Sequence, residues 1–208
     1  MNNRRVLLTA FEPFDGDEQN SSQQVAEFVL PSLQQRCALR YTLLPVVRWR
    51  ASEQAIREID AFQPELVIML GQAGKRRRVT PERVAVNMDW FPIPDNAGNQ
   101  PLGESICKDG PAAYFSTLPV TSIADRANDQ GIASKVSNTA GLYVCNHVFY
   151  AVMHHIARMA PAPIAGFIHL PRVADGNTGG GRGLPLASMA AAVALALEEC
   201  LDCPQREV

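Results

Sequence analysis

Short apolar runs and segments with helical spacing alternate along almost the whole chain, and this alternation limits the possible folds more than any other feature. The runs that we expect to form strands occupy residues 6–10, 39–47, 66–70, 83–88, 132–136 and 164–170. The segments that we expect to form helices cover residues 21–31, 52–62, 121–130, 145–157 and 188–201. Strand–helix alternation of this kind predicts an α/β fold with a mostly parallel sheet and helices on both faces.

Length and composition predict a single domain over residues 1–208. Apolar residues make up 47% of the chain and charged residues 19%, as in packed globular proteins. The formal net charge of -2 gives no reason to expect nucleic acid or an anionic membrane as a partner. No stretch approaches the roughly 18–20 apolar residues of a membrane span. The first apolar run is too short for a signal peptide, so we expect a cytoplasmic protein.

The chain has five cysteines, and their odd number and scattered positions indicate free thiols rather than a disulfide framework. Cys200 and Cys203 lack the strand-to-helix context of a redox motif and are expected at the end of a helix. No cluster of histidine, cysteine and aspartate has metal-ligand spacing, so we expect neither a metal nor a cofactor.

In parallel sheets the functional site collects at the carboxyl ends of the strands, which here include the segments after Ala10 and Leu70. Cys145 lies at the N-terminus of a predicted helix, where the helix dipole lowers a thiol pKa and free amides can hold an oxyanion. His169 ends a predicted buried strand and could face Cys145 as its base. The alternative interpretation is that both are structural residues of the core.

A carboxylate that orients the imidazole would complete such a site, and the candidates are Glu82, Asp89 and Asp95. Sequence pattern alone does not choose among the three. His147 lies two residues from Cys145, a spacing that points the two side chains apart on one helix.

The remaining polar features have simpler interpretations. His154 and His155 are expected on a solvated or partly packed helix face, and the basic run at residues 75–78 is expected in a solvated loop. The glycine-rich segment at residues 176–183 has no following Lys-Ser/Thr, so it is not a phosphate-binding P-loop.

Several separate blocks, in order, resemble the pyrrolidone-carboxylate peptidase (pyroglutamyl peptidase I) family of cysteine peptidases over nearly the whole chain. The blocks are LLTAFEPF (residues 7–14), GQAG (71–74), PERVAVN (81–87), IPDN (93–96), TAG (139–141), VCNH (144–147) and FIHLP (167–171). The resemblance implies a three-layer α/β/α sandwich around a twisted, mostly parallel sheet. It also implies a homotetramer, because bacterial members of the family are typically tetrameric.

The resemblance places the catalytic residues of the family on Glu82, Cys145 and His169. It implies that His169 deprotonates Cys145, which attacks the carbonyl that joins an N-terminal pyroglutamyl residue to the rest of a peptide. Pyroglutamate then leaves through a thioacyl-enzyme intermediate, while Glu82 holds the imidazole in its working tautomer. Peptides with N-terminal pyroglutamate are the partners that this chemistry implies.

The substrate pocket is implied in the same way. Family positions that pack on the neutral, flat lactam ring match Phe11 and Phe14, and positions near the site match Asn20 and Gln72. A dry aromatic pocket rejects an ordinary charged N-terminus, because desolvating an unpaired ammonium is costly.

The chain departs from the family pattern around this pocket. The family usually has glycine at the positions of Ala10 and Asp15 and arginine at that of Pro92, and the segment 172–185 has a different sequence. Two alternative functions therefore stay open. One is a thiol amidohydrolase acting on another small lactam or amide, and the other is a catalytically decayed homologue that binds small molecules.

Overall fold

A five-stranded sheet in the order β2-β1-β3-β9-β4 forms the centre of the computed structural model, which describes residues 4–174 and 183–202. Its strands are β1 (Arg5–Phe11), β2 (Ala38–Leu44), β3 (Leu66–Gln72), β9 (Ile164–Leu170) and the short β4 (Thr80–Pro81). The first four run parallel, and β4 pairs antiparallel with β9 at the edge. The expectation of a mostly parallel sheet is confirmed.

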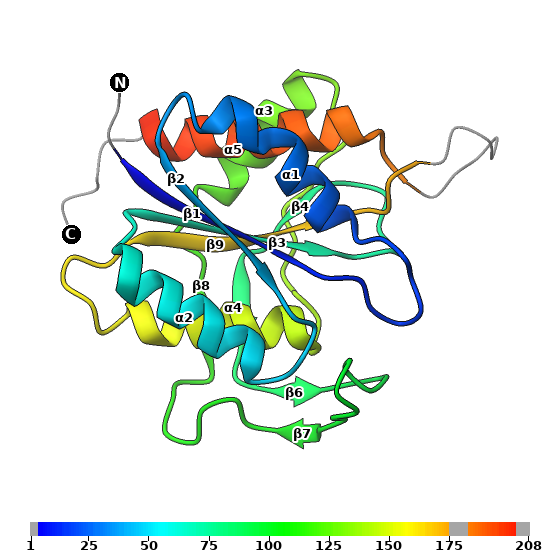
Figure 1. Ribbon diagram of the computed structural model, residues 1–208, viewed down its shortest axis with the longest axis vertical. Helices are drawn as coiled ribbons and strands as arrows, with labels where there is room; N and C mark the ends of the chain where they lie inside the picture. The colour runs from blue at the N-terminus through cyan, green and yellow to red at the C-terminus, as the bar shows by residue number, and fades with distance from the viewer. Residues whose placement is uncertain (1–3, 175–182, 203–208) are drawn as a thin grey trace.

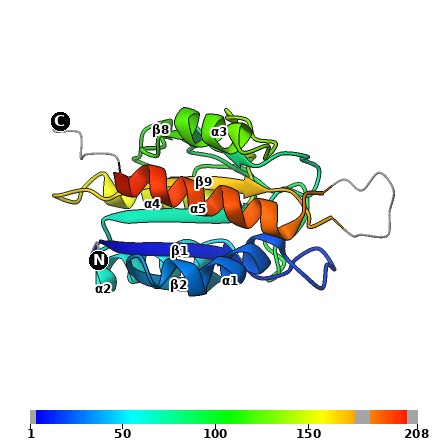
Figure 2. The ribbon, with the colours of Figure 1, turned by 90° about the horizontal axis from the view of Figure 1, so that it is seen from above.

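Helices cover both faces of this sheet. One face carries α1 (Ser21–Leu33), α3 (Val120–Asp129) and α5 (Leu186–Asp202), and the other carries α2 (Arg50–Phe62) and α4 (Val144–Ile156) (Figure 1). Figure 2 shows α1, α5 and α3 side by side over their face. The arrangement is the three-layer α/β/α sandwich that the family resemblance implied.

Alternate residues of the central strands point to opposite faces, and this period of two divides the core into two clusters. The cluster under α1, α3 and α5 contains Val6, Leu8, Leu66, Ile68, Leu70, Ile168 and Leu170. The cluster under α2 and α4 contains Leu7, Phe11, Val67, Met69, Ala165 and Phe167. Gly71 and His169 continue the second series, so they belong to the face that α4 covers.

Two short hairpin-like sheets lie beside α4 and outside the central sheet. One pairs β5 (Val84–Val86) with β8 (Ala113–Phe115), and the other pairs β6 (Asp89–Trp90) with β7 (Leu102–Glu104). Of the strand expected at residues 83–88, only residues 84–86 form a strand, and this strand, β5, belongs to a separate sheet.

The strand expected at residues 132–136 is wrong, because the structure has only isolated parallel bridges there. The main chain of residues 133–137 exchanges hydrogen bonds with that of residues 79–83 on both sides of Pro81. Proline has no N–H to donate, so the one bond that would join these two halves into a ladder is missing.

Element ends show the same influence of proline. The expected end of β2 at residue 47 is three residues too late, because Pro45 follows Leu44 and stops the strand. Helix α1, in contrast, continues past Pro31 to Leu33.

In the described parts of the chain, no helix is long and apolar enough to cross a membrane.

Candidate active site

A pocket of about 380 Å³ opens at the carboxyl ends of β1, β3 and β9, against the first turn of α4. Cys145 and His169 both line it, together with the aromatic side chains of Phe11, Phe14 and Tyr143. The carboxyl ends of the strands are where the strand–helix alternation predicted a site.

Cys145 is the second residue of α4, and its sulfur lies against the backbone of β3. A Cβ built on Gly71 would come within 2.9 Å of the Cys145 Sγ. Gly71 is the register partner of His169 on the neighbouring strand. Because Gly71 has no side chain, the Cys145 sulfur has room against β3. The sulfur therefore lies beside the strand position that pairs with His169.

The start of α4 also supplies amide donors. Tyr143 occupies the N-cap position and, among the residues that the structure describes, makes no side-chain cap for the helix. The first amides of a helix have no partner within the helix, so those of Val144 and Cys145 are available at the pocket wall. Such donors can stabilise an oxyanion formed on a carbonyl that the sulfur attacks.

Glu82 and His169 are in contact although 87 positions separate them in the chain. The Nδ1 of His169 lies 2.8 Å from the Oε1 of Glu82, and both side chains are buried. A carboxylate accepts hydrogen bonds, so Nδ1 carries the proton and Nε2 keeps its lone pair. The main chain holds this pair as well, because the Glu82 amide donates to the Phe167 carbonyl at 2.8 Å.

Arg76 reaches into the same site, and the sequence analysis missed it. Its Nη1 contacts the Oε1 of Glu82 and the hydroxyl of Thr80, and its Nη2 donates to the Thr139 carbonyl at 2.8 Å. The expectation of a solvated basic loop is wrong for this residue. Its neighbour Lys75 is exposed and lines the pocket. One feature of the sequence could have indicated Arg76: the basic run at residues 75–78 follows the carboxyl end of β3, where functional residues collect.

The electrostatics of the site favour neutral groups at rest. Burial raises the pKa of the Cys145 thiol to about 12 and the Glu82 carboxylate adds to the rise, while Arg76 and the residue's own amide oppose it. Burial also lowers the pKa of His169 below its ordinary value, with Glu82 opposing and Arg76 adding to the shift. The expected lowering of the thiol pKa by the helix N-terminus is therefore wrong, because desolvation outweighs it.

Aromatic rings form the apolar wall of the pocket. Phe11 packs against Phe167 with ring centroids 6.3 Å apart, and Phe14 packs against Tyr143 at 5.9 Å. Tyr143 also meets Phe91 edge to face at 4.7 Å, which fixes its ring. Phe11 and Phe14 line the pocket, and their contact with a lactam ring stays a prediction; Tyr143 is a further ring there that sequence reasoning missed.

Asn20 and Gln72 line the pocket too, and both support its walls. Asn20 caps α1 by accepting the Ser22 amide at 2.9 Å. Gln72 accepts the Ser21 amide at 2.8 Å and donates to Asp17 at 3.2 Å. Asp17 in turn forms an ion pair with Arg172 at 2.7 Å, which joins the segment after β9 to the segment after β1.

The departures from the family pattern lie close to this wall. Ala10 is fully buried in β1, Pro92 lines the pocket, and Asp15 has a left-handed backbone with φ of 56°. Glycine adopts that conformation without strain, whereas aspartate pays a small steric cost. Residues 175–182 of the altered 172–185 segment, and Cys203, lie outside the described residues.

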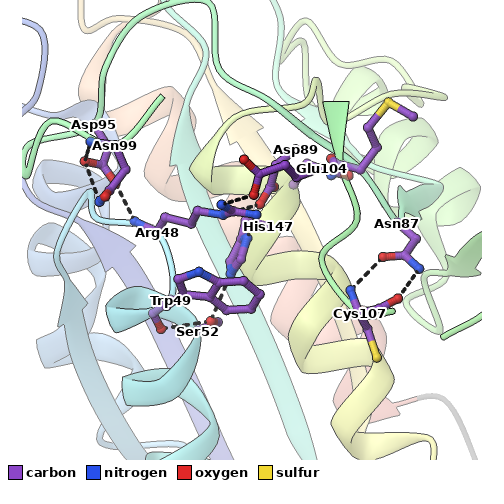
Figure 3. A network of polar contacts seen from close by, with 12 residues as sticks. Arg48, Trp49, Ser52, Asn87, Asp89, Asp95, Asn99, Glu104, Cys107 and His147 are labelled. Atoms are coloured by element: carbon purple, nitrogen blue, oxygen red, sulfur yellow. Dashed lines mark hydrogen bonds and ion pairs between the residues drawn. The ribbon is translucent and has the colours of Figure 1, made fainter. Parts of the chain in front are cut away.

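The other two candidate carboxylates belong to a separate network beside the pocket (Figure 3). Asp89 accepts from His147 Nδ1 and from Arg48 Nε, both at 2.7 Å. Asp95 accepts the Arg48 amide at 2.7 Å and bonds with Asn99 in its own loop. His147 reaches Ser52 at 3.2 Å through its other nitrogen and is fully buried, so it points away from the pocket.

Several known proteins with sequences similar to this chain are pyroglutamyl or pyrrolidone-carboxylate peptidases. A family model described as pyroglutamyl peptidase matches residues 4–202. A pyrrolidone-carboxylate peptidase of Vibrio vulnificus strain CMCP6 is 41% identical over 97% of this chain and 95% of its own length. The one of Bacillus velezensis is 40% identical over 83% of this chain and 80% of its own length.

Solved structures give the same result for the fold. The crystal structure of Bacillus amyloliquefaciens pyroglutamyl peptidase I matches with a TM-score of 0.89 and 35% identity, over 97% of this chain and 98% of that one. Pyrrolidone carboxyl peptidase from Thermococcus litoralis matches with a TM-score of 0.88 and 35% identity, over 96% of this chain and 94% of that one. With a matching family model over nearly its whole length, this chain belongs to the pyroglutamyl peptidase family.

Proposed function

We propose that this protein is a cysteine peptidase that removes an N-terminal pyroglutamyl residue from peptides, with Cys145 as nucleophile, His169 as base and Glu82 as the group that orients the imidazole. The observation that carries this proposal is the buried contact between Glu82 and His169 at a pocket that also contains Cys145. A thiol, an imidazole and a carboxylate in this order are the components of acyl transfer by a cysteine.

The reaction begins with a neutral thiol and a neutral imidazole. His169 takes the thiol proton on Nε2 as the sulfur of Cys145 attacks the carbonyl carbon of the pyroglutamyl residue. The oxyanion forms against the amides of the first turn of α4. His169 then gives the proton to the leaving amine, and water releases pyroglutamate from the thioester with the same residue as base.

The pocket fits a neutral lactam. Phe11, Phe14 and Tyr143 offer flat apolar surface to the ring, and the cationic side chains of Lys75 and Arg76 lie at the same pocket. A peptide with a free N-terminus would bring an ammonium group toward these two cations and would have to desolvate it. Both effects favour the uncharged pyroglutamyl end.

The test is hydrolysis of pyroglutamyl p-nitroanilide by the wild type and by Cys145→Ala, with Cys37→Ser as the matched thiol control. Cys37 is buried, and its thiol donates to the Leu33 carbonyl at 3.4 Å, a contact that a serine hydroxyl can keep. We expect turnover by the wild type and by Cys37→Ser, and none by Cys145→Ala. If the wild type instead cleaves prolyl or acyl anilides and not the pyroglutamyl one, the substrate assignment is wrong.

We also propose a cytoplasmic homotetramer. Free thiols at Cys37, Cys107 and Cys145 support a reducing compartment. Exposed apolar side chains at Trp90, Leu102 and Phe115 offer surface for contacts between copies. Light scattering after gel filtration measures the assembly directly, and the mass of a single chain would reject the tetramer.

A further inference from the structure

Three reactive side chains meet outside the pocket, at the far end of α4. Cys107 Sγ lies 3.3 Å from His154 Nε2, and Tyr114 Oη lies 2.8 Å from His154 Nδ1. Cys107 comes from the segment between β7 and β8, Tyr114 from β8 and His154 from the last turn of α4. Nine residues of helix, or about 14 Å of rise, separate His154 from Cys145.

One ring nitrogen of His154 keeps a lone pair. Burial lowers its pKa below the ordinary value, and the neighbouring Arg158 and His155 lower it further, so the ring is neutral near pH 7. In the tautomer that donates Nδ1–H to the Tyr114 oxygen, the lone pair of Nε2 faces the Cys107 sulfur. The thiol proton then has an acceptor within hydrogen-bond distance.

The ring and the thiol are both held in place. Tyr150 stacks on His154 with ring centroids 6.0 Å apart and an interplanar angle of 11°. The amide of Cys107 donates to the Asn87 side chain at 2.8 Å, and the Cys107 carbonyl accepts from it at 2.7 Å (Figure 3). A Cβ on Gly110 would lie 3.3 Å from the sulfur, so glycine there leaves room for the thiol.

Access distinguishes this thiol from the other cysteines that the structure describes outside the pocket. Cys37 and Cys200 are buried in the core cluster, whereas Cys107 and His154 are both partly exposed. A thiol with solvent access and a neighbouring base has the environment of a reactive cysteine.

From this geometry we propose that Cys107 and His154 form a second thiol–imidazole pair, a modification site at which Cys107 exchanges with low-molecular-weight disulfides. His154 Nε2 takes the proton from the Cys107 thiol, and the thiolate attacks one sulfur of the disulfide R–S–S–R. The new bond joins Cys107 Sγ to that sulfur, the old S–S bond breaks, and the second half leaves as RS⁻. The disulfide is the oxidant, and no other co-reactant is needed.

The experiment uses full-length Cys145→Ala protein, so that the pocket thiol does not react, and oxidised glutathione as the probe. Peptide mass spectrometry gives the initial rate at which Cys107 gains the mixed disulfide near pH 7. His154→Gln is compared with the matched variant His155→Gln, whose histidine contacts Asp60 and not a thiol. We expect His154→Gln to slow the reaction about tenfold, because it removes the nitrogen that takes the thiol proton. His155→Gln should react nearly like its parent, because His155 is the smallest of the three contributions to the lowered pKa of His154.

Equal rates in the two histidine variants would overturn the proposal, as would a parent rate no higher than that of a small thiol of ordinary pKa. Circular dichroism checks that each variant is folded. Should His154→Gln fail to fold, Tyr114→Phe decides instead, since it removes only the hydroxyl that holds Nδ1 and should also slow Cys107. An unchanged rate in Tyr114→Phe would then reject the pair. These results do not depend on peptidase activity.

Discussion

Gly71 and Cys145 fit together across the boundary between sheet and helix, because the absent side chain of Gly71 leaves the space that the Cys145 sulfur occupies. The same glycine pairs in register with His169. The absence of a side chain at Gly71 therefore lets the first turn of α4 approach the sheet closely, next to the strand that carries the imidazole.

The first prediction concerns this contact. In Gly71→Ala the new Cβ would lie 2.9 Å from the Cys145 Sγ and 2.7 Å from the Phe167 ring. Overpacking of this kind costs about 1–3 kcal/mol of stability, measurable by urea unfolding, and it should displace the sulfur and reduce kcat. The double variant Gly71→Ala/Phe167→Leu relieves the ring clash alone, so we expect recovered stability without recovered kcat. Full activity of Gly71→Ala would refute the close approach.

The second prediction concerns Glu82. Glu82→Gln keeps the shape of the side chain but presents an amide to His169, so the ring loses its preferred tautomer and the stabilisation of its cation. We expect kcat for the pyroglutamyl anilide to fall about 10²–10⁴-fold with little change in KM. The control is Glu104→Gln, which changes an exposed carboxylate that pairs with Arg48 at 2.7 Å rather than with His169. This variant should keep its rate. A similar kcat in both variants would remove Glu82 from the mechanism.

The third prediction compares two neighbouring arginines. Arg76 contacts Glu82 and lowers the pKa of His169, whereas Arg77 is exposed. In Arg76→Met the pKa of His169 should rise, so the acid limb of kcat/KM should move to higher pH and the rate at neutral pH should fall. Arg77→Met should reproduce the wild-type profile. Coincident profiles for the two variants would mean that Arg76 has no influence on the imidazole.

The fourth prediction is the pH dependence of the wild type. His169 must be unprotonated to act as a base, and its pKa is lowered from the ordinary value of 6.5, so activity should persist below that pH before it falls. The pKa of the Cys145 thiol is raised to about 12, so ionisation of that thiol should produce no limb between neutral pH and about pH 10. Steady-state kcat/KM across this range is the measurement. A limb at the pKa of an isolated thiol, about 8.5, would contradict the neutral resting pair.

The fifth prediction concerns Asp95, which holds the loop beside the pocket. Burial would raise the pKa of Asp95, but hydrogen bonds from Asn99 and from the amides of Arg48, Asn99 and Ala97 outweigh it, and the pKa lies below its ordinary value of 3.8. A carboxyl group whose pKa is lower in the folded protein stabilises the fold at pH values above its pKa in the unfolded chain. That stabilisation is lost as the pH falls through the pKa of the folded protein.

Asp95→Asn should therefore be less stable than the wild type by about 1–3 kcal/mol at pH 7. The difference should shrink as the pH falls below the ordinary value of 3.8 and through the lowered pKa of Asp95. Urea unfolding of the two proteins at several pH values measures it, and a difference that does not change with pH would show that the charge of Asp95 contributes nothing.

Much of this fold is readable from the sequence because the buried strands are continuous apolar runs. β1, β3 and β9 were predicted within two residues at each end, since each is buried on both faces. β4, β6, β7 and β8 have two or three residues each, too few to show a period, and were missed. The partners of β4 and β8 also lie far along the chain, so no local pattern indicates these two strands.

The site divides in a similar way. The position of Cys145 before a helix and of His169 at a strand end could be read from periodicity, because both follow from the ends of regular elements. The choice of Glu82 over Asp89 and Asp95 needed the resemblance, since local sequence does not reveal that β4 pairs with β9. Arg76 was missed because a run of basic residues normally faces solvent, and only the fold turns one member inward.

The way in which β4 lies on β9 has a consequence for how activity can fail. Glu82 and His169 are linked by main-chain pairing at one sheet edge, while Cys145 arrives on a helix from another layer. Loosening of α4 would separate Cys145, the proposed nucleophile, from an intact contact between Glu82 and His169 without melting the sheet. Inactivation under mild heat or low denaturant should thus precede global unfolding and reverse on return to native conditions.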